Sequence, residues 1–304
     1  MLKMLYYFLV IPGFLFTAFI GLLSTWIDRK VTARLQWRQG PPLYQPFADI
    51  LKLLGKETFL PDDASKVKFI WAPLTGMAAV TIVSTILWIL NINPYWSFAG
   101  DLILMIFLLT IPSIALITGG SVSKNPLSIL GVSRERKLLL AYEIPFIISI
   151  LIAAVKAGSI LIGKILGHQI IGSFSGMIAF IVSFLVIQAQ LGFAPFESTE
   201  AEQEIESGPL LEYSGWLLAV FKLSKAMLLF TLPVLLITLF LGGIDTYSLA
   251  GALWFILKYV VILTLMILVK NTNPRIRIDQ AVFFFLGPVT IMAVIGLILA
   301  MIGR

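Results

Sequence analysis

The chain has 304 residues, of which 59% are apolar and 12% are charged, whereas soluble domains carry about 25% charged residues. This composition excludes a water-soluble domain and indicates a protein whose solvent is the lipid bilayer. With no cysteine and one histidine, the chain cannot by itself hold an iron–sulfur cluster, a zinc ion or a haem through the usual ligands, and its charge of +6 fits basic membrane loops better than nucleic-acid binding.

Eight apolar stretches are each long enough to cross a membrane core, which needs about 20 helical residues. Helices are the expected structure, because lipid offers no partner for unsatisfied backbone groups. The sequence therefore predicts an all-α polytopic membrane protein that forms one domain over residues 1–304. The eight predicted spans are 4–27, 69–91, 98–118, 138–162, 173–191, 214–241, 249–269 and 280–303.

The loop after the first span contains a predicted amphipathic helix. Between Pro42 and Glu57, apolar residues recur at helical spacing and Asp49, Lys52 and Lys56 fall on the other side. Such a helix lies in the membrane interface or against a docked subunit. Periodicity alone leaves both a structural anchor and a functional role open.

Lys and Arg residues predict the orientation. The loops after the first, third, fifth and seventh spans hold eight, four, none and three of them, whereas the opposite side holds three. Because basic loops stay in the cytoplasm, we expect both termini outside the cell membrane of a prokaryote.

Four charged residues fall deep inside the predicted spans, where a charge costs several kcal/mol unless it has a partner, water or a task. Glu143 lies about five residues into the fourth span, and Lys258 lies inside the seventh. Lys222 and Lys225 are three residues apart and share a face of the sixth span, which favours carboxylates or a hydrated cavity opposite them. We interpret them as parts of a proton or ion path, with a structural ion pair as the alternative.

The loop between the fifth and sixth spans is acidic on an otherwise basic face. Closely spaced carboxylates raise one another's pKa and hold protons near neutral pH, although residue type alone also fits a cation site. The spacing lacks the glycine turn of calcium loops, and we predict no metal site. The six acids are Glu197, Glu200, Glu202, Glu204, Glu206 and Glu212.

Four segments resemble the complex I subunit 1 (NuoH) family of respiratory membrane subunits. They contain Arg38-x-Gly40-Pro41 with Gln45-Pro46-x-Ala48-Asp49, Tyr142-Glu143, the acidic loop through Tyr213, and Pro274-Arg275-x-Arg277-x-Asp279. The first loop lacks the asparagine typical of complex I. The run from Glu204 to Gly215 is more similar to the homologous subunit of membrane-bound [NiFe] hydrogenases and formate hydrogenlyase.

The resemblance implies a membrane anchoring and coupling subunit that links ferredoxin-driven electron transfer in a peripheral arm to proton or sodium translocation. It implies no redox centre on this chain, with iron–sulfur clusters and a [NiFe] centre on partner subunits. The implied partners are peripheral cluster-bearing and hydrogenase-like subunits, antiporter-like and small membrane subunits, and the bilayer. It also assigns Glu143, Glu202, Glu204 and Glu212 to an acidic channel.

Ten residues on the expected cytoplasmic face are predicted to dock the peripheral arm, because clustered cations suit charge-assisted contacts. Binding to lipid headgroups is the alternative for the same residues. They are Arg34, Arg38, Gln45, Asp49, Lys52, Arg134, Arg136, Lys137, Arg275 and Arg277.

Other functions remain open at this stage. One is a quinone-chamber subunit of a donor:quinone oxidoreductase, and another is a subunit of a sulfur-reducing relative. A stand-alone cation transporter is the more distant alternative, since the sequence shows no internal inverted repeat. The residues do not decide the pumped ion or the terminal acceptor.

Overall fold

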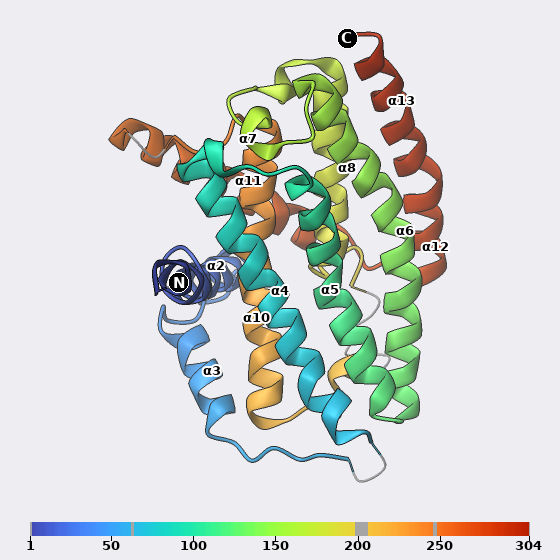
Figure 1. The fold of residues 1–304 in the computed structure, drawn as a ribbon. Coiled ribbons are helices and arrows are strands. Elements are labelled where there is room, and N and C mark those ends of the chain that lie inside the picture. Colours follow the sequence, from blue (N-terminus) through green and yellow to red (C-terminus); the bar gives the residue numbers. More distant parts are fainter. Residues whose placement is uncertain (1, 62–63, 198–205, 246–247, 304) are drawn as a thin grey trace.

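The computed structural model describes residues 2–61, 64–197, 206–245 and 248–303, and every regular element in these ranges is helical (Figure 1). The long elements are α1 (Leu2–Leu9), α2 (Phe14–Leu35), α3 (Gln45–Leu54), α4 (Lys66–Ile92), α5 (Asp101–Val122), α6 (Pro126–Ala157), α8 (Phe174–Gln190), α10 (Gly215–Phe240), α11 (Leu249–Thr272), α12 (Ile278–Phe284) and α13 (Thr290–Met301). The short elements are α7 (Ile162–Ile165), η1 (Pro94–Trp96), η2 (Ile170–Gly172), η3 (Gly208–Leu210) and the π-helical η4 (Phe285–Val289).

The prediction of a polytopic all-α membrane protein is confirmed. Among the described residues, seven helical stretches are long and apolar enough to cross a membrane. The predicted fifth span is the 17-residue helix α8, which at 1.5 Å per residue is about 26 Å long and falls at the short end of spanning lengths. The amphipathic helix of the first loop is also present, as α3.

Two predicted boundaries differ from the structure. The first span is broken between α1 and α2, around Pro12. The basic stretch before the fourth span, predicted as a loop, is helical: α6 begins at Pro126, where the side chain of Asn125 accepts a hydrogen bond from the amide of Leu127. Proline at the first helical position and an asparagine cap are both start signals, so Arg134, Arg136 and Lys137 lie on a helix.

Helix α10 lies at the centre of the bundle. In its most apolar stretch 89% of the residues are buried, against 28% for α11. Helix α2 crosses it closely, because a Cβ built on Gly21 would lie 2.4 Å from the carbonyl oxygen of Ala226 on α10. In Figure 1 α2 is seen almost along its axis while α4, α6 and α10 run up the page, so α2 is steeply inclined to them.

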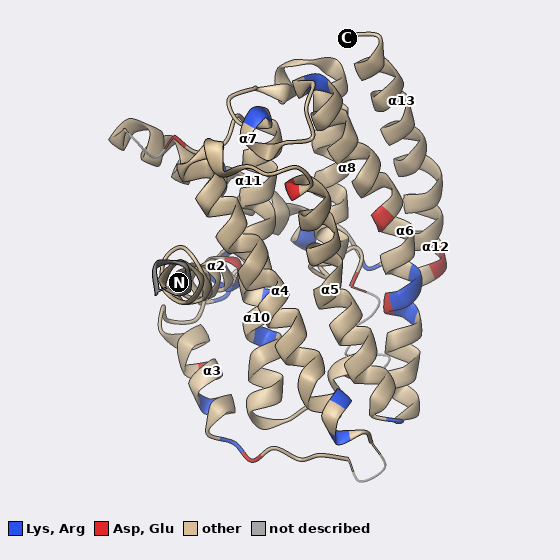
Figure 2. Ribbon diagram, viewed as in Figure 1, with Lys and Arg blue, Asp and Glu red and all other residues tan. Residues whose placement is uncertain are grey.

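The helices do not all end at the same level. Tyr142 of α6 packs against Phe285, and α6 and α12 run side by side in Figure 1. Tyr142 is sixteen residues after the start of α6, whereas Phe285 is only seven residues after the start of α12. Helix α6 thus extends about nine residues, roughly 13 Å, beyond the start of α12. We call this end of the bundle, where α3 also lies, the α3 end. Charged residues gather toward it (Figure 2).

Candidate functional site

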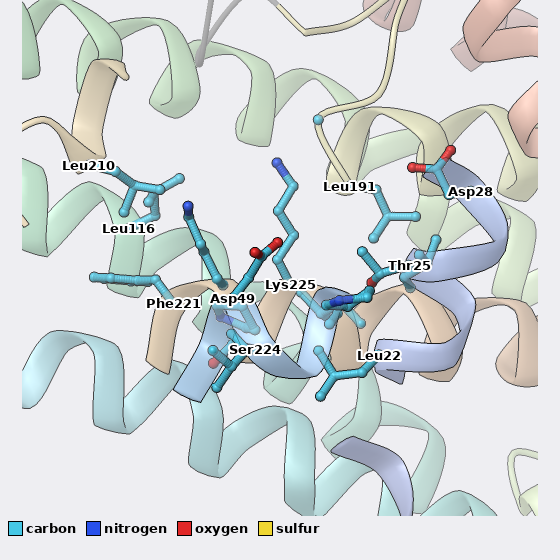
Figure 3. Close-up of a pocket in the computed structure, with 18 of the residues that line it drawn as sticks. Leu22, Thr25, Asp28, Asp49, Leu116, Leu191, Leu210, Phe221, Ser224 and Lys225 are labelled. Atoms are coloured by element: carbon cyan, nitrogen blue, oxygen red, sulfur yellow. The ribbon is translucent and has the colours of Figure 1, made fainter. Parts of the chain in front are cut away.

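A cavity of about 600 Å³ lies near the α3 end, between α2, α3, α5, α10 and the end of α8 (Figure 3). Much of its wall is apolar, with side chains such as Leu22, Leu116, Phe221 and Leu229. Eight charged residues also line it, and charges at this depth in a membrane protein require ion-pair partners, water or a functional role. They are Asp28, Arg29, Asp49, Lys52, Lys56, Glu135, Lys222 and Lys225.

An ion pair joins the two helices that form one wall of the cavity. Arg29 Nη1 on α2 donates to Asp49 Oδ2 on α3 at 2.7 Å, and the amide of Gln45 donates to the other oxygen at 2.9 Å. The hydrogen bond from Arg29 holds the pKa of Asp49 below its usual value, against the opposing effect of partial burial. Asp49 is therefore an anion at neutral pH, and it fixes α3 to α2.

A second ion pair fixes α2 to α11. Lys270 Nζ donates to Asp28 Oδ2 at 2.8 Å, and the same ammonium lies 4.3 Å from the ring centroid of Phe193, which also lines the cavity. The Asp28 side chain is only 9% exposed, so this pair is largely desolvated. The neighbouring residues Asp28 and Arg29 thus connect α2 to two different helices.

The predicted shared face of Lys222 and Lys225 points into this cavity. Both residues line it, and Lys222 is exposed although the rest of α10 is almost entirely buried. The positive charge of Lys222 also acts on Asp49. In Figure 3 the Lys225 side chain extends away from α10. These lysines therefore border an open volume, and the packed core of the bundle lies deeper along α10.

A polar contact joins the cavity wall to α6 at the residue before Glu143. Ser113, which lines the cavity, lies 3.1 Å from the hydroxyl of buried Tyr142, and Glu143 is the next residue on α6. Within the described residues Glu143 forms no hydrogen bond or ion pair, and its side chain is half-buried. Glu135, two turns earlier on α6, is buried and lines the cavity.

The acidic loop is described only in part. Glu197 pairs with Arg275 at 2.9 Å, and Glu212 accepts a 2.6 Å hydrogen bond from Asn125 at the start of α6. Glu206 is exposed. The other three predicted acids, Glu200, Glu202 and Glu204, lie outside the described residues.

The end of the acidic loop is tightly packed between α5 and α6. A Cβ on Gly131 would lie 2.6 Å from Cδ of Pro209, and one on Gly120 would lie 3.0 Å from its Cβ. Tyr213 then stacks on Phe69 of α4 at a centroid distance of 4.0 Å, and burial raises the pKa of Tyr213. These contacts fix Glu212 on the α3 end of the bundle.

Lys258 lies apart from the other predicted path residues. Its ammonium donates to the carbonyl oxygen of Leu241 at 2.7 Å, directly after the end of α10. Lys225 is sixteen residues earlier, which along a helix is about 24 Å. A lysine at this position satisfies a free carbonyl and favours the helix dipole, which is a structural role.

The predicted docking residues fall into two groups. Asp49 and Lys52 line the cavity, and Gln45 holds Asp49. The remaining seven lie on helix ends and loops of the α3 end, and all of them except half-buried Arg134 are exposed: Arg34, Arg38, Arg134, Arg136, Lys137, Arg275 and Arg277.

Sequence reasoning missed several cavity residues, among them Asp28, Arg29 and Glu135. Asp28 and Arg29 look like an ordinary polar end of the first span. Glu135 carried a recognisable signal, because it falls in the buried stripe Ser128, Val132, Glu135 and Leu139 at helical spacing. Reading that stretch as a loop hid the pattern.

No group of three or more His, Cys, Asp and Glu residues that could hold a metal ion occurs in the part of the chain that the structure describes. The family model described as NADH dehydrogenase matches residues 7–301, nearly the whole chain. The chain belongs to this family. As a family member it is a multi-pass membrane subunit of the NuoH type, as the motif resemblance implies.

Curated relatives in the family include the H subunit of NADH-quinone oxidoreductase from Bacillus mycoides, 34% identical over 84% of this chain and 81% of the relative. The same subunit from a Geobacillus species is 34% identical over 83% of this chain and 80% of the relative. Among solved structures, a chain of the membrane-bound sulfane sulfur reductase, an archaeal respiratory membrane complex, matches with a TM-score of 0.87 and 30% identity. That match covers 99% of this chain and 100% of the other.

Proposed function

We propose that this chain is the anchoring and coupling subunit of an energy-converting redox complex of the hydrogenase or sulfur-reductase type. The observation that carries the proposal is the structural match to the sulfane sulfur reductase chain, which covers 99% of this chain and 100% of the other with a TM-score of 0.87. In this role the chain carries no redox centre. Partner subunits carry iron–sulfur clusters, and electron transfer from ferredoxin drives proton or sodium movement.

The α3 end is the proposed dock for the peripheral arm. Exposed guanidinium groups at Arg34, Arg38, Arg136 and Arg277 offer charge-assisted hydrogen bonds to acidic partner surfaces. The projecting turns of α6 extend this surface beyond the start of α12. By the distribution of basic residues, this end faces the cytoplasm of a prokaryotic cell and both termini face outside.

The proposed coupling path starts at the charged cavity. A redox event in the docked arm changes a charge near the cavity, and this alters the proton affinity of nearby groups. Lys222, Lys225 and Glu135 line the cavity, and a contact between Ser113 and Tyr142 supports a path from its wall to the neighbouring Glu143. Antiporter-like membrane partners on the far side of Glu143 receive the proton or cation.

A quinone-chamber subunit is the second candidate. It is favoured by the 34% identity to NADH-quinone oxidoreductase subunits and by a cavity of about 600 Å³, within the range of about 300–1,000 Å³ usual for ligand sites.

A pull-down separates these functions. The chain is tagged and purified from its own membranes, and the sample is analysed for subunits, iron, nickel and extractable quinone. Iron-containing partners without quinone support the proposal, with nickel indicating a hydrogenase centre and its absence the sulfur-reductase type. Stoichiometric quinone supports the second candidate. A chain that purifies alone and moves cations in vesicles overturns both in favour of a transporter.

A further inference from the structure

The cavity is polarised along its length. On α10, Lys222 and Lys225 come first and the apolar Leu229 follows one turn later. On α2, which is steeply inclined to α10, Leu22 and Asp28 both line the cavity and lie almost two turns apart. Along α10 the two lysines thus lie nearer the α3 end than Leu229 does, and along α2 the charged and apolar parts of the wall are separated in the same way.

The charges of the cavity are not balanced within the described residues. Asp28 is engaged by Lys270, and Asp49 is engaged by Arg29. Lys52, Lys56 and Lys222 line the same cavity and form no ion pair with any residue that the structure describes. Three exposed ammonium groups beside an apolar wall favour a ligand that combines an anionic group with an apolar part.

The level of the cavity in the bundle matches that of lipid headgroups. Its wall includes Gln190, the last residue of α8, and Asp28, whose partner Lys270 is two residues before the end of α11. Helices α8 and α11 are apolar spans that end at this point, so the membrane–water interface lies there.

We propose that the cavity binds an anionic membrane amphiphile. Lys52, Lys56 and Lys222 contact its phosphate-bearing headgroup, and an acyl or isoprenoid chain lies along the apolar wall formed by Leu22, Leu229 and their neighbours. Such a ligand supplies a counter-charge for the lysines and an apolar partner for the cavity wall. The inference rests on the proposed function, because the second candidate function would place a neutral quinone in the same cavity.

Native mass spectrometry of the delipidated complex tests this proposal. The complex is titrated with palmitoyl-oleoyl phosphatidylglycerol, with the matching phosphatidylcholine, and with glycerol 1-phosphate as a headgroup without a chain. We expect one phosphatidylglycerol per chain, bound on the order of tenfold more tightly than phosphatidylcholine, and no displacement by glycerol 1-phosphate at equal concentration.

Charge variants locate the site. Lys52→Gln with Lys222→Gln removes two of the three cations that form no ion pair with a described residue, and it is expected to abolish the preference for phosphatidylglycerol. Lys66→Gln, an exposed lysine at the same end that does not line the cavity, keeps the preference. Equal binding of the two lipids, an unchanged preference in the double variant, or the same loss in Lys66→Gln overturns the proposal.

Two further readouts keep the test independent of folding and of ligand source. Because the chain has no cysteine, Leu53→Cys at the cavity wall can be labelled with an anionic thiol reagent while all three lysines are kept, and phosphatidylglycerol should slow labelling at least several-fold while phosphatidylcholine should not. Displacement of the lipid by glycerol 1-phosphate identifies a soluble anion as the ligand, and displacement by a short-chain quinone alone identifies a neutral quinone. Either result contradicts the proposal.

Discussion

Arg29 and Asp49 form a 2.7 Å ion pair between α2 and α3, with side chains 44% and 36% exposed, at the wall of the cavity. Because both groups are solvated, the pair contributes less than about 1 kcal/mol to stability. Its importance is positional: α3 is a ten-residue helix outside the membrane spans, and this contact joins it to α2 at the cavity wall.

Asp49→Asn is expected to loosen α3 without unfolding the bundle. In a chain that carries Leu53→Cys as its only thiol, we predict labelling of the cavity-lining position to accelerate several-fold in Asp49→Asn. Asp279→Asn, an exposed acid on α12, is the matched control. An unchanged labelling rate in Asp49→Asn means that α3 is held by its apolar face alone.

The pH dependence of this contact has a defined sign. The folded pKa of Asp49 is lowered, so the stabilisation is fully present above the unfolded pKa of about 3.9 and is lost as pH falls through the lower folded value. The labelling rate of the Leu53→Cys chain with Asp49 intact, corrected for thiol ionisation, should therefore stay constant from pH 8 to 5 and rise only in stronger acid. A rise centred between pH 6 and 7 would assign control of α3 to another group.

Lys270→Gln should destabilise the protein much more than the loss of the Arg29–Asp49 ion pair would. It leaves the carboxylate of Asp28 buried without its cation, for which a loss of about 3–5 kcal/mol is typical. The double variant with Asp28→Asn removes both charges and should recover much of this loss. A double-mutant cycle on thermal unfolding of the purified complex measures the coupling, and additive effects would show that the two residues act independently.

Gly131→Ala tests the packing of the acidic loop against α6. Its new methyl group would lie 2.6 Å from Cδ and 2.9 Å from the backbone nitrogen of Pro209, so η3 must shift. Overpacking of this kind costs about 1–3 kcal/mol. Gly172→Ala, where a Cβ meets nothing within 4 Å, is the control and should leave the melting temperature unchanged. Equal stability of the two variants would indicate that η3 is loosely held.

Arg34→Glu with Arg38→Glu is expected to release the peripheral arm from purified membranes, because both side chains are exposed at the α3 end. Lys164→Glu, an exposed cation on α7 near the opposite end, should retain it. Quantitative detection of iron in the membrane and soluble fractions measures the release. Full retention in the double reversal would exclude these two residues as docking contacts.

Glu143→Gln is expected to assemble normally and to reduce or abolish ion pumping while electron transfer persists in part. The change preserves size and removes the charge of a half-buried group that has no ion pair within the described residues. Glu204→Gln, in the acidic loop, is predicted to behave in the same way, and Glu57→Gln, an exposed acid at the α3 end, serves as control. The number of ions pumped per electron is measured in vesicles. If both path variants keep the value of the unmodified complex, these carboxylates have only a structural role.

The sequence was sufficient for the helices but not for their arrangement. Length and apolar composition located the spans, and periodicity located α3. It could not identify α10 as the central helix, because α10 has a lower mean hydropathy than lipid-facing α11, 2.0 against 2.5. Lipid and protein core are equally apolar, so burial in a bundle depends on close helix contacts between small residues such as Gly21 and Ala226.

The candidate site was predictable only where charge and helical spacing coincided. Lys222 and Lys225 met that condition, and they line the cavity. Asp28 and Glu135 did not stand out, because each lies beside basic residues in a stretch that looked like a membrane flank. Lys258 has the same intramembrane character as the cavity lysines, yet it caps α10 far from them. Depth along one helix does not show which neighbouring element a side chain meets.

Helix α6 runs unbroken for 32 residues, about 48 Å, and Pro145 lies inside it, two residues after Glu143. Proline cannot donate the backbone hydrogen bond to the residue four positions earlier, so the helix bends most easily there. The turns that project at the α3 end and the turns beyond Pro145 are therefore joined at a bend point next to a carboxylate. A docked protein that displaces the projecting turns would bend α6 there and change the surroundings of Glu143.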